Sequence, residues 1–222
     1  MADILITGAT RRQGSGRGTR VVLIKGWPIV AWAAVAVAAM VAAILVWVGD
    51  YDVSLPMATR ATGRTSLAFF LAAFMASTLY RILPAGRGRW LLKNRRYLGV
   101  SFAASHAIHA VLLTATINRL QLDYSPITLA GGGLGYVFIA AMAATSFDRT
   151  AAWLGRKRWR LLHSVGAYAL WGIFVVTYLG EAGEHPLHAV LLGLLVVCLL
   201  LKLGVRFAVK PGVKPPEVPA RG

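Results

Sequence analysis

The chain has 222 residues, of which 57% are hydrophobic and 14% are charged, and its mean hydropathy is +0.63. A soluble domain of this length could not bury so much apolar surface, so the composition predicts a membrane protein. The net charge of +16 does not indicate a nucleic-acid partner, because the charges fall between apolar runs instead of along one face.

Six apolar segments of about 20 residues, the length that a helix needs to cross a bilayer, follow one another along the chain. The connections between them are short and polar, so we expect neighbouring helices to run antiparallel. The predicted fold is an all-α, integral membrane six-helix bundle over residues 27–209, after an arm of residues 1–26 and before a disordered tail of residues 210–222. The predicted spans are Trp27–Val48, Thr65–Leu83, Tyr97–Thr116, Ile127–Thr145, Trp159–Tyr178 and Leu187–Val209.

The basic residues predict the orientation of the bundle. All of the 24 Lys and Arg residues except Arg60, Arg64 and Arg119 fall in the N-terminal arm, the second connection, the fourth connection or the C-terminal end. These four regions lie on the same side of a six-span bundle. Lys and Arg gather on the cytoplasmic side of membrane proteins, so both termini are predicted to be cytoplasmic.

Four histidines are the candidate functional residues. His106 and His109 lie one helical turn apart in the third span, His163 lies at the start of the fifth span, and His188 lies at the start of the sixth. An ionisable side chain at membrane depth is costly and marks a functional site by default. Neutral imidazole is a standard axial ligand of haem iron, so these residues are candidate haem ligands. Hydrogen bonding to a neighbouring helix and proton relay are the alternative roles.

The two best candidates are predicted to lie at different depths. His109 is 13 residues, and His163 three residues, past the last arginine of the basic cluster that precedes its span. At a rise of 1.5 Å per residue their heights differ by about 15 Å. The two residues therefore fit separate haems better than one. His188 enters from the other side at about the depth of His109 and could complete its site, and His106 could pair with His163 if the helices tilt.

A series of short motifs accompanies these histidines. Thr62-Gly63-Arg64-Thr65 opens the second span, and Arg95-Arg96-Tyr97-Leu98-Gly99 opens the third, with His109 ten residues after the glycine. Thr145-Ser146 closes the fourth span, and Leu154-Gly155, Arg158-Trp159 and Leu162-His163 open the fifth. In order and spacing this series resembles the ferric-reductase-like transmembrane superfamily. The resemblance covers residues 62–178 and is greatest to the haem-binding membrane subunits of bacterial methionine-sulfoxide reductase systems.

The resemblance implies a b-type haem protein of the bacterial inner membrane that binds one or two haems. Residues matching His109 and His163 are haem ligands in that family. A third family histidine, near the outer end of the fifth span, is replaced here by the run Val175-Val176-Thr177-Tyr178, and His106 and His188 are extra histidines that could compensate. Electrons would pass from a cytoplasmic flavin reductase or reduced flavin (FMN or FAD) to a periplasmic acceptor protein.

Two other functions remain open from the sequence. A proton-relay transporter would use the same buried histidines, and a haemless membrane scaffold would keep the fold and anchor a partner. The chain contains no flavin or nicotinamide domain, so we expect an electron-transfer subunit of a membrane oxidoreductase with no catalytic residue of its own.

Overall fold

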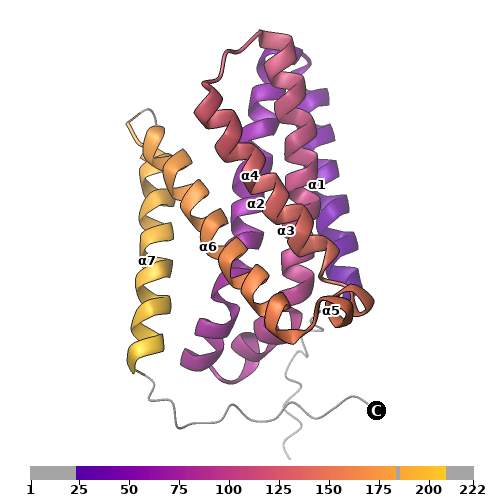
Figure 1. The fold of residues 1–222 in the computed structure, drawn as a ribbon. Helices are drawn as coiled ribbons and strands as arrows, with labels where there is room; N and C mark the ends of the chain where they lie inside the picture. The colour runs from indigo at the N-terminus through magenta and orange to yellow at the C-terminus, as the bar shows by residue number, and fades with distance from the viewer. Residues whose placement is uncertain (1–23, 184–185, 209–222) are drawn as a thin grey trace, which may run out of the picture.

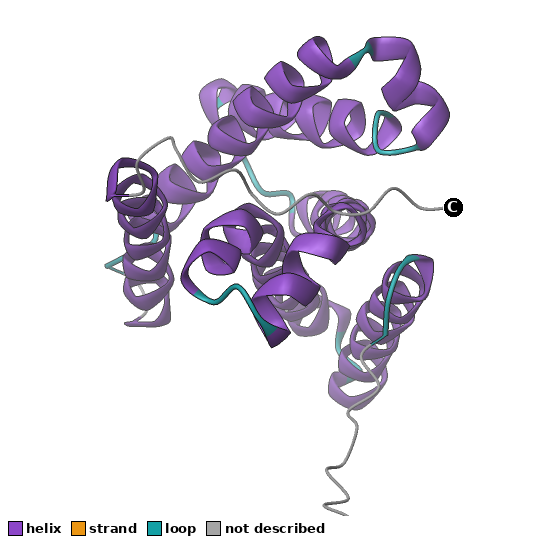
Figure 2. Ribbon diagram, turned by 90° about the horizontal axis from the view of Figure 1, so that it is seen from below, coloured by secondary structure: helices purple, strands orange, loops and turns teal. Residues whose placement is uncertain are grey.

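The computed structural model describes residues 24–183 and 186–208, so the predictions for most of the N-terminal arm and for the C-terminal tail lie outside the described residues. The described part contains seven helices and no strand (Figures 1 and 2). Six of these helices are long and apolar enough to cross a membrane, which confirms the predicted number of spans. The helices are α1 (Trp27–Val48), α2 (Tyr51–Ile82), α3 (Gly86–Leu120), α4 (Pro126–Ala144), α5 (Asp148–Leu154), α6 (Arg156–Gly180) and α7 (Pro186–Ala208).

Local signals in the sequence explain where these helices begin and end. Ser125 caps α4, since its side chain accepts a hydrogen bond of 3.2 Å from the Thr128 N–H. Proline follows at the first position of α4, where its missing N–H costs nothing. Gly155 separates α5 from α6 with a φ of +78°, a conformation that side chains with a Cβ rarely adopt.

The second and third helices are longer than the apolar runs from which they were predicted. The side chain of Asp50 accepts from the Asp52 N–H and starts α2 at Tyr51, well before the predicted Thr65. Hydropathy identifies only the stretch that crosses a bilayer, and a helix continues past it wherever its backbone hydrogen bonds do. The short helix α5 was not predicted at all.

The helices pack in two groups that share α2 and α3. In Figure 1, α1 lies on one side of α2 and α3, and the pair α6 and α7 lies on the other. The core between them is rich in aromatic rings: Phe70 of α2 lies 5.3 Å from Phe174 of α6 and 5.5 Å from Phe102 of α3, measured between ring centroids. Most of α1, α4 and α7 is exposed, as lipid-facing helices are. Because lipid is as apolar as these side chains, close packing and polar contacts must hold the helices together.

Two pairs of hydroxyl groups join α2 to α3. Thr59 Oγ1 lies 3.0 Å from Thr116 Oγ1, and Ser66 Oγ lies 2.9 Å from Ser105 Oγ. All four residues are buried. We call these two pairs the hydroxyl seam. Small polar residues of this kind let two membrane helices approach closely and hydrogen-bond across the interface.

A lysine fixes α7 against α2. Lys202 lies within the span, and its Nζ donates a hydrogen bond of 2.7 Å to the carbonyl oxygen of Phe74. The same ammonium group lies 4.2 Å from the centroid of the Phe74 ring. The two contacts give a cation inside the bundle a carbonyl and an aromatic face as partners.

Replacing Gly166 with valine is expected to destabilise the protein. A Cβ at Gly166 would lie 2.5 Å from Met142 Sδ and 3.3 Å from Phe138 Cδ1, so the added side chain must displace the Met142 side chain or move α4 from α6. Overpacking of this kind costs about 1–3 kcal/mol. The melting temperature in detergent should fall for Gly166→Val and stay near the wild-type value for Gly172→Val, since a Cβ at Gly172 meets no described atom within 4 Å.

Candidate functional site

His109 is held against α2 through one ring nitrogen. Its Nδ1 lies 3.0 Å from the carbonyl oxygen of Thr59 and 3.2 Å from Thr62 Oγ1. A carbonyl oxygen only accepts hydrogen bonds, so Nδ1 carries the proton. The other nitrogen, Nε2, then keeps its lone pair and can bind a metal.

His106 lies beside His109 in a box of aromatic rings. Its ring centroid is 4.9 Å from that of His109, 5.1 Å from that of Tyr136 and 6.2 Å from that of Phe174. Two buried polar atoms in this box, His106 Nδ1 and the Tyr136 hydroxyl, have no hydrogen-bond partner within the described part of the chain. Buried polar atoms are almost always paired in folded proteins, so this pair indicates a place where a bound group or water would complete the contacts.

His163 is held in a different way at the start of α6. Its ring stacks on that of Trp159 with centroids 4.1 Å apart, and its Nε2 lies 3.1 Å from Thr145 Oγ1. The Thr145 hydroxyl donates its single proton to the Ala141 carbonyl at 2.7 Å, so the oxygen accepts from His163. In this arrangement Nε2 carries the proton and the lone pair is on Nδ1.

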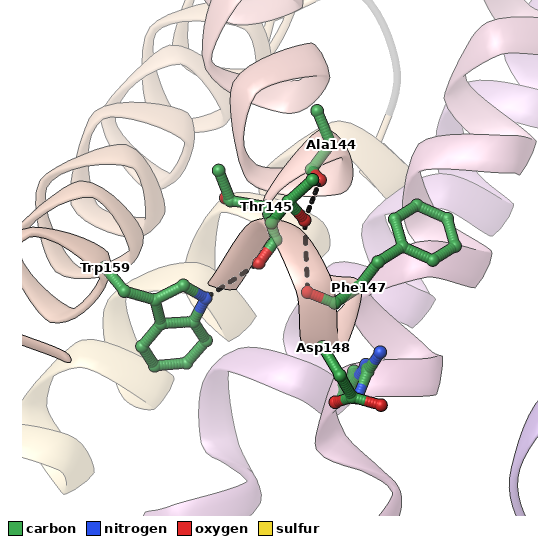
Figure 3. A network of polar contacts seen from close by, with 7 residues as sticks. Ala144, Thr145, Phe147, Asp148 and Trp159 are labelled. Atoms are coloured by element: carbon green, nitrogen blue, oxygen red, sulfur yellow. Dashed lines mark hydrogen bonds and ion pairs between the residues drawn. The ribbon is translucent and has the colours of Figure 1, made fainter. Parts of the chain in front are cut away.

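Backbone carbonyls of the turn that follows α4 accept further hydrogen bonds beside Thr145 (Figure 3). Trp159 Nε1 donates a hydrogen bond of 2.9 Å to the Thr145 carbonyl, and Thr150 Oγ1 donates to the carbonyls of Ala144 and Phe147. Thr145 is therefore bonded to Trp159 through its backbone and to His163 through its side chain. The turn fixes the rotation of the His163 ring.

A cavity of about 330 Å³ lies beside His163. Its walls come from four helices, α2, α3, α4 and α6, and are largely apolar. One set of lining residues is basic, and these lie in the N-terminal part of α3. The apolar lining includes Phe70, Phe74, Phe102, Ile139 and Leu170, and the basic lining is Lys93, Arg95 and Arg96.

One basic residue of the cavity is tied to the short helix α5. Arg96 Nη1 lies 2.5 Å from Asp148 Oδ1, whereas Arg96 Nε is buried without a hydrogen-bond partner among the residues that the structure describes. Asp148 is almost fully exposed at the start of α5, and the preceding Phe147 stacks on Trp27 of α1 with centroids 5.4 Å apart. This corner therefore links α1, α3 and α5 beside the cavity.

The structure separates the predicted ligands into two levels. Gly99 of α3 lines the same cavity as His163, so the two lie at a similar depth. His109 is ten residues further along α3, a rise of about 15 Å in a straight helix. His106 belongs with His109, because their rings are in contact and both lie beyond the cavity. Its pairing with His163 stays a prediction.

His188 lies in a third place, at the connection between α6 and α7. Its Nδ1 is 3.1 Å from the carbonyl oxygen of Glu181 and 3.5 Å from the carboxylate of the same residue. On α6, the side chain of Val176 is 71% exposed, and Phe174 and Tyr178 are the buried neighbours. The run of residues 175–178, where the family histidine is missing, therefore has both exposed and buried positions.

Four residues that the sequence did not identify as candidate site residues contact His109 or His163. Thr62 and Gly63 contact His109, and Thr145 and Trp159 contact His163. All four belong to the short motifs quoted above. The motif order was thus the available signal, but the sequence alone did not assign these residues a role.

Comparison with known proteins gives a partial match. The chain is 33% identical over 111 residues to the protein-methionine-sulfoxide reductase heme-binding subunit MsrQ of Salmonella paratyphi B, and equally to those of Salmonella newport and Salmonella heidelberg. The match covers 47% of this chain and 54% of each relative, so the chain spans about half the length of the curated relatives it matches. No family model and no solved structure matches the chain.

Proposed function

We propose that this chain is a b-type haem subunit that carries electrons across the bacterial inner membrane. The cavity beside His163 is the observation that carries the proposal, because an imidazole, apolar walls and basic side chains meet there inside a membrane bundle. The similarity to proteins named as heme-binding subunits supports the same reading. The donor would be a cytoplasmic flavin or flavoprotein, and the acceptor would lie on the periplasmic side.

The residues of the cavity fit the chemistry of haem. Haem is a flat apolar ring with two carboxylates at one edge, and its iron takes a histidine nitrogen as an axial ligand. Phe70, Phe102 and Leu170 offer apolar surface, while Arg95 and Arg96 offer cations for the carboxylates. The volume is within the range of about 300–1,000 Å³ typical of small-molecule sites.

A non-covalent, b-type haem is the form that the sequence favours. Covalent attachment uses the two cysteines of a C-x-x-C-H motif, and this chain has one cysteine, Cys198 of α7. When bound, haem supplies one-electron redox chemistry, and the protein tunes it through ligands, burial and hydrogen bonds.

His109 and His163 are the proposed ligands of two separate sites. His109 presents an unprotonated Nε2 as the ligating nitrogen, because Nδ1 carries the proton. His163 would bind iron through Nδ1. It could bind through Nε2 only if its ring turned and the hydrogen bond to Thr145 Oγ1 broke. Among the residues that the structure describes, His106 Nδ1 and the Tyr136 hydroxyl have no hydrogen-bond partner, which supports a bound group next to His109. His106 and His188 remain the proposed alternatives for completing that outer site.

The basic face supplies the proposed docking surface for the donor. Under the positive-inside rule the start of α3, α5 and the start of α6 face the cytoplasm, together with both termini. Among the described acidic residues only Asp148 lies at this face, and Arg96 pairs with it. The remaining Lys and Arg side chains would attract a flavin phosphate or an acidic protein surface.

The test is a reduced-minus-oxidised visible spectrum of the full chain purified in detergent, with haem quantified per chain. We expect the α-band of a b-type haem at one or two haems per chain. A colourless protein from haem-replete cells would contradict the proposal. It would leave the proton-relay transporter and the haemless scaffold as the remaining functions.

A further inference from the structure

The contact between His109 and α2 is more specific than helix packing requires. Thr59 and Thr62 lie three residues apart on one face of α2, and both reach the same nitrogen of the imidazole. The Thr62 hydroxyl has one proton, which it donates to the carbonyl of Ala58 or of Thr59, each at 2.9 Å. Its oxygen is therefore left to accept from His109 Nδ1, so two acceptors share one N–H.

Gly63 defines which edge of the ring faces α2. A Cβ at this position would lie 3.3 Å from His109 Cε1 and 3.6 Å from Nδ1. The edge that carries Nδ1 thus lies directly against the α2 backbone, where only glycine leaves enough room for unhindered contact. The hydrogen bonds that hold the ring to α2 both use Nδ1, so they leave the lone pair of Nε2 available.

Hydrogen bonds to the second nitrogen of a ligating histidine fix its tautomer and its rotation, and they raise the basicity of the ligand. We infer that Thr62 is a positioning residue for His109: with the Thr59 carbonyl and Gly63 it forms a socket on α2 that holds Nε2 ready to ligate haem iron. This inference rests on the proposed function. It adds a residue that binds no haem itself but sets the redox properties of the outer site.

The first test replaces Thr62 with valine, which keeps the shape of the side chain and removes the acceptor. Loss of an outer hydrogen bond of this kind lowers metal affinity by about 10–100-fold. We therefore expect Thr62→Val to lower the haem affinity of the His109 site about tenfold, to raise its midpoint potential and to shift its electron paramagnetic resonance g values. Thr62→Ser restores the hydroxyl and should restore all three properties.

Thr59→Val is the matched control. It removes a hydroxyl of the hydroxyl seam one turn away on the same helix face, but it leaves the Thr59 carbonyl that His109 uses. If Thr62 acts only as an interhelical contact, the two valine variants will change haem affinity and potential equally. That result, or wild-type values in Thr62→Val, would overturn the inference.

A second pair of variants tests the socket by size. Gly63→Val should displace the His109 ring and remove haem from the outer site, with the haem beside His163 retained. Gly172→Val is the control, because no described atom lies within 4 Å of its Cβ. Retention of outer haem with unchanged g values in Gly63→Val would overturn the socket. A wild-type protein that binds no haem would instead contradict the proposed function, so the two failures are distinguishable.

Discussion

Gly99→Leu is expected to remove about one haem per chain from the purified protein. Gly99 lines the cavity beside His163, and a Cβ built there meets no described atom within 4 Å. The Cβ of a leucine therefore meets no clash, and the rest of the side chain would occupy cavity space that the proposed haem needs. The measurement is haem per chain from the visible spectrum, compared with the wild-type protein at equal expression.

The control for this variant is Gly172→Leu, which also adds a leucine to a membrane helix but lines no part of the cavity. It should keep the wild-type haem content. Since both substitutions add the same apolar side chain at a position with open space, a difference between them reports on the cavity. An unchanged haem content in Gly99→Leu would show that the cavity is not the haem site.

The second large effect is expected from the two proposed ligands. His163→Ala should lose the haem in the cavity, and His109→Ala should lose the outer haem, because each removes an axial nitrogen at its own depth. The double variant should then contain none. Haem content is measured per chain, and the spectrum of each single variant should show the band that the other lacks.

Unchanged haem content in both single variants would contradict the ligand assignment. His106→Ala and His188→Ala identify the residue that completes the outer site. His188 is engaged by Glu181 at the connection of α6 and α7, so we expect its variant to keep the wild-type spectrum. A loss of outer haem in His106→Ala would place this residue at the site that His109 shares.

The sequence predicted the spans well because length and hydropathy are properties of each segment alone. It placed the starts of α2 and α3 too late in the chain. The first turns of these helices are polar, and hydropathy does not report helix formation. It missed α5 because seven residues between basic clusters carry too little periodic signal. The orientation of the bundle and the terminal segments stay predictions.

The candidate site was predictable only in part. A histidine within an apolar run is visible in the sequence. Counting residues from the basic clusters placed His109 ten residues deeper than His163. In the structure Gly99, which lines the cavity beside His163, also precedes His109 by ten residues. The cavity was not predictable, because it depends on how four helices tilt and rotate against one another. The proton positions on the two rings likewise depend on contacts between helices. For His109 these contacts are with Thr62 and Thr59, which lie 47 and 50 residues earlier in the chain.

The composition of the cavity wall also constrains biogenesis. Residues from α2, α3 and α4 are synthesised first, but the imidazole and the last apolar wall come from α6. A nascent chain that ends before α6 therefore has no complete pocket, however well its earlier helices are inserted. Loading of the proposed haem beside His163 would therefore follow membrane insertion of α6, so this haem would join an almost finished protein.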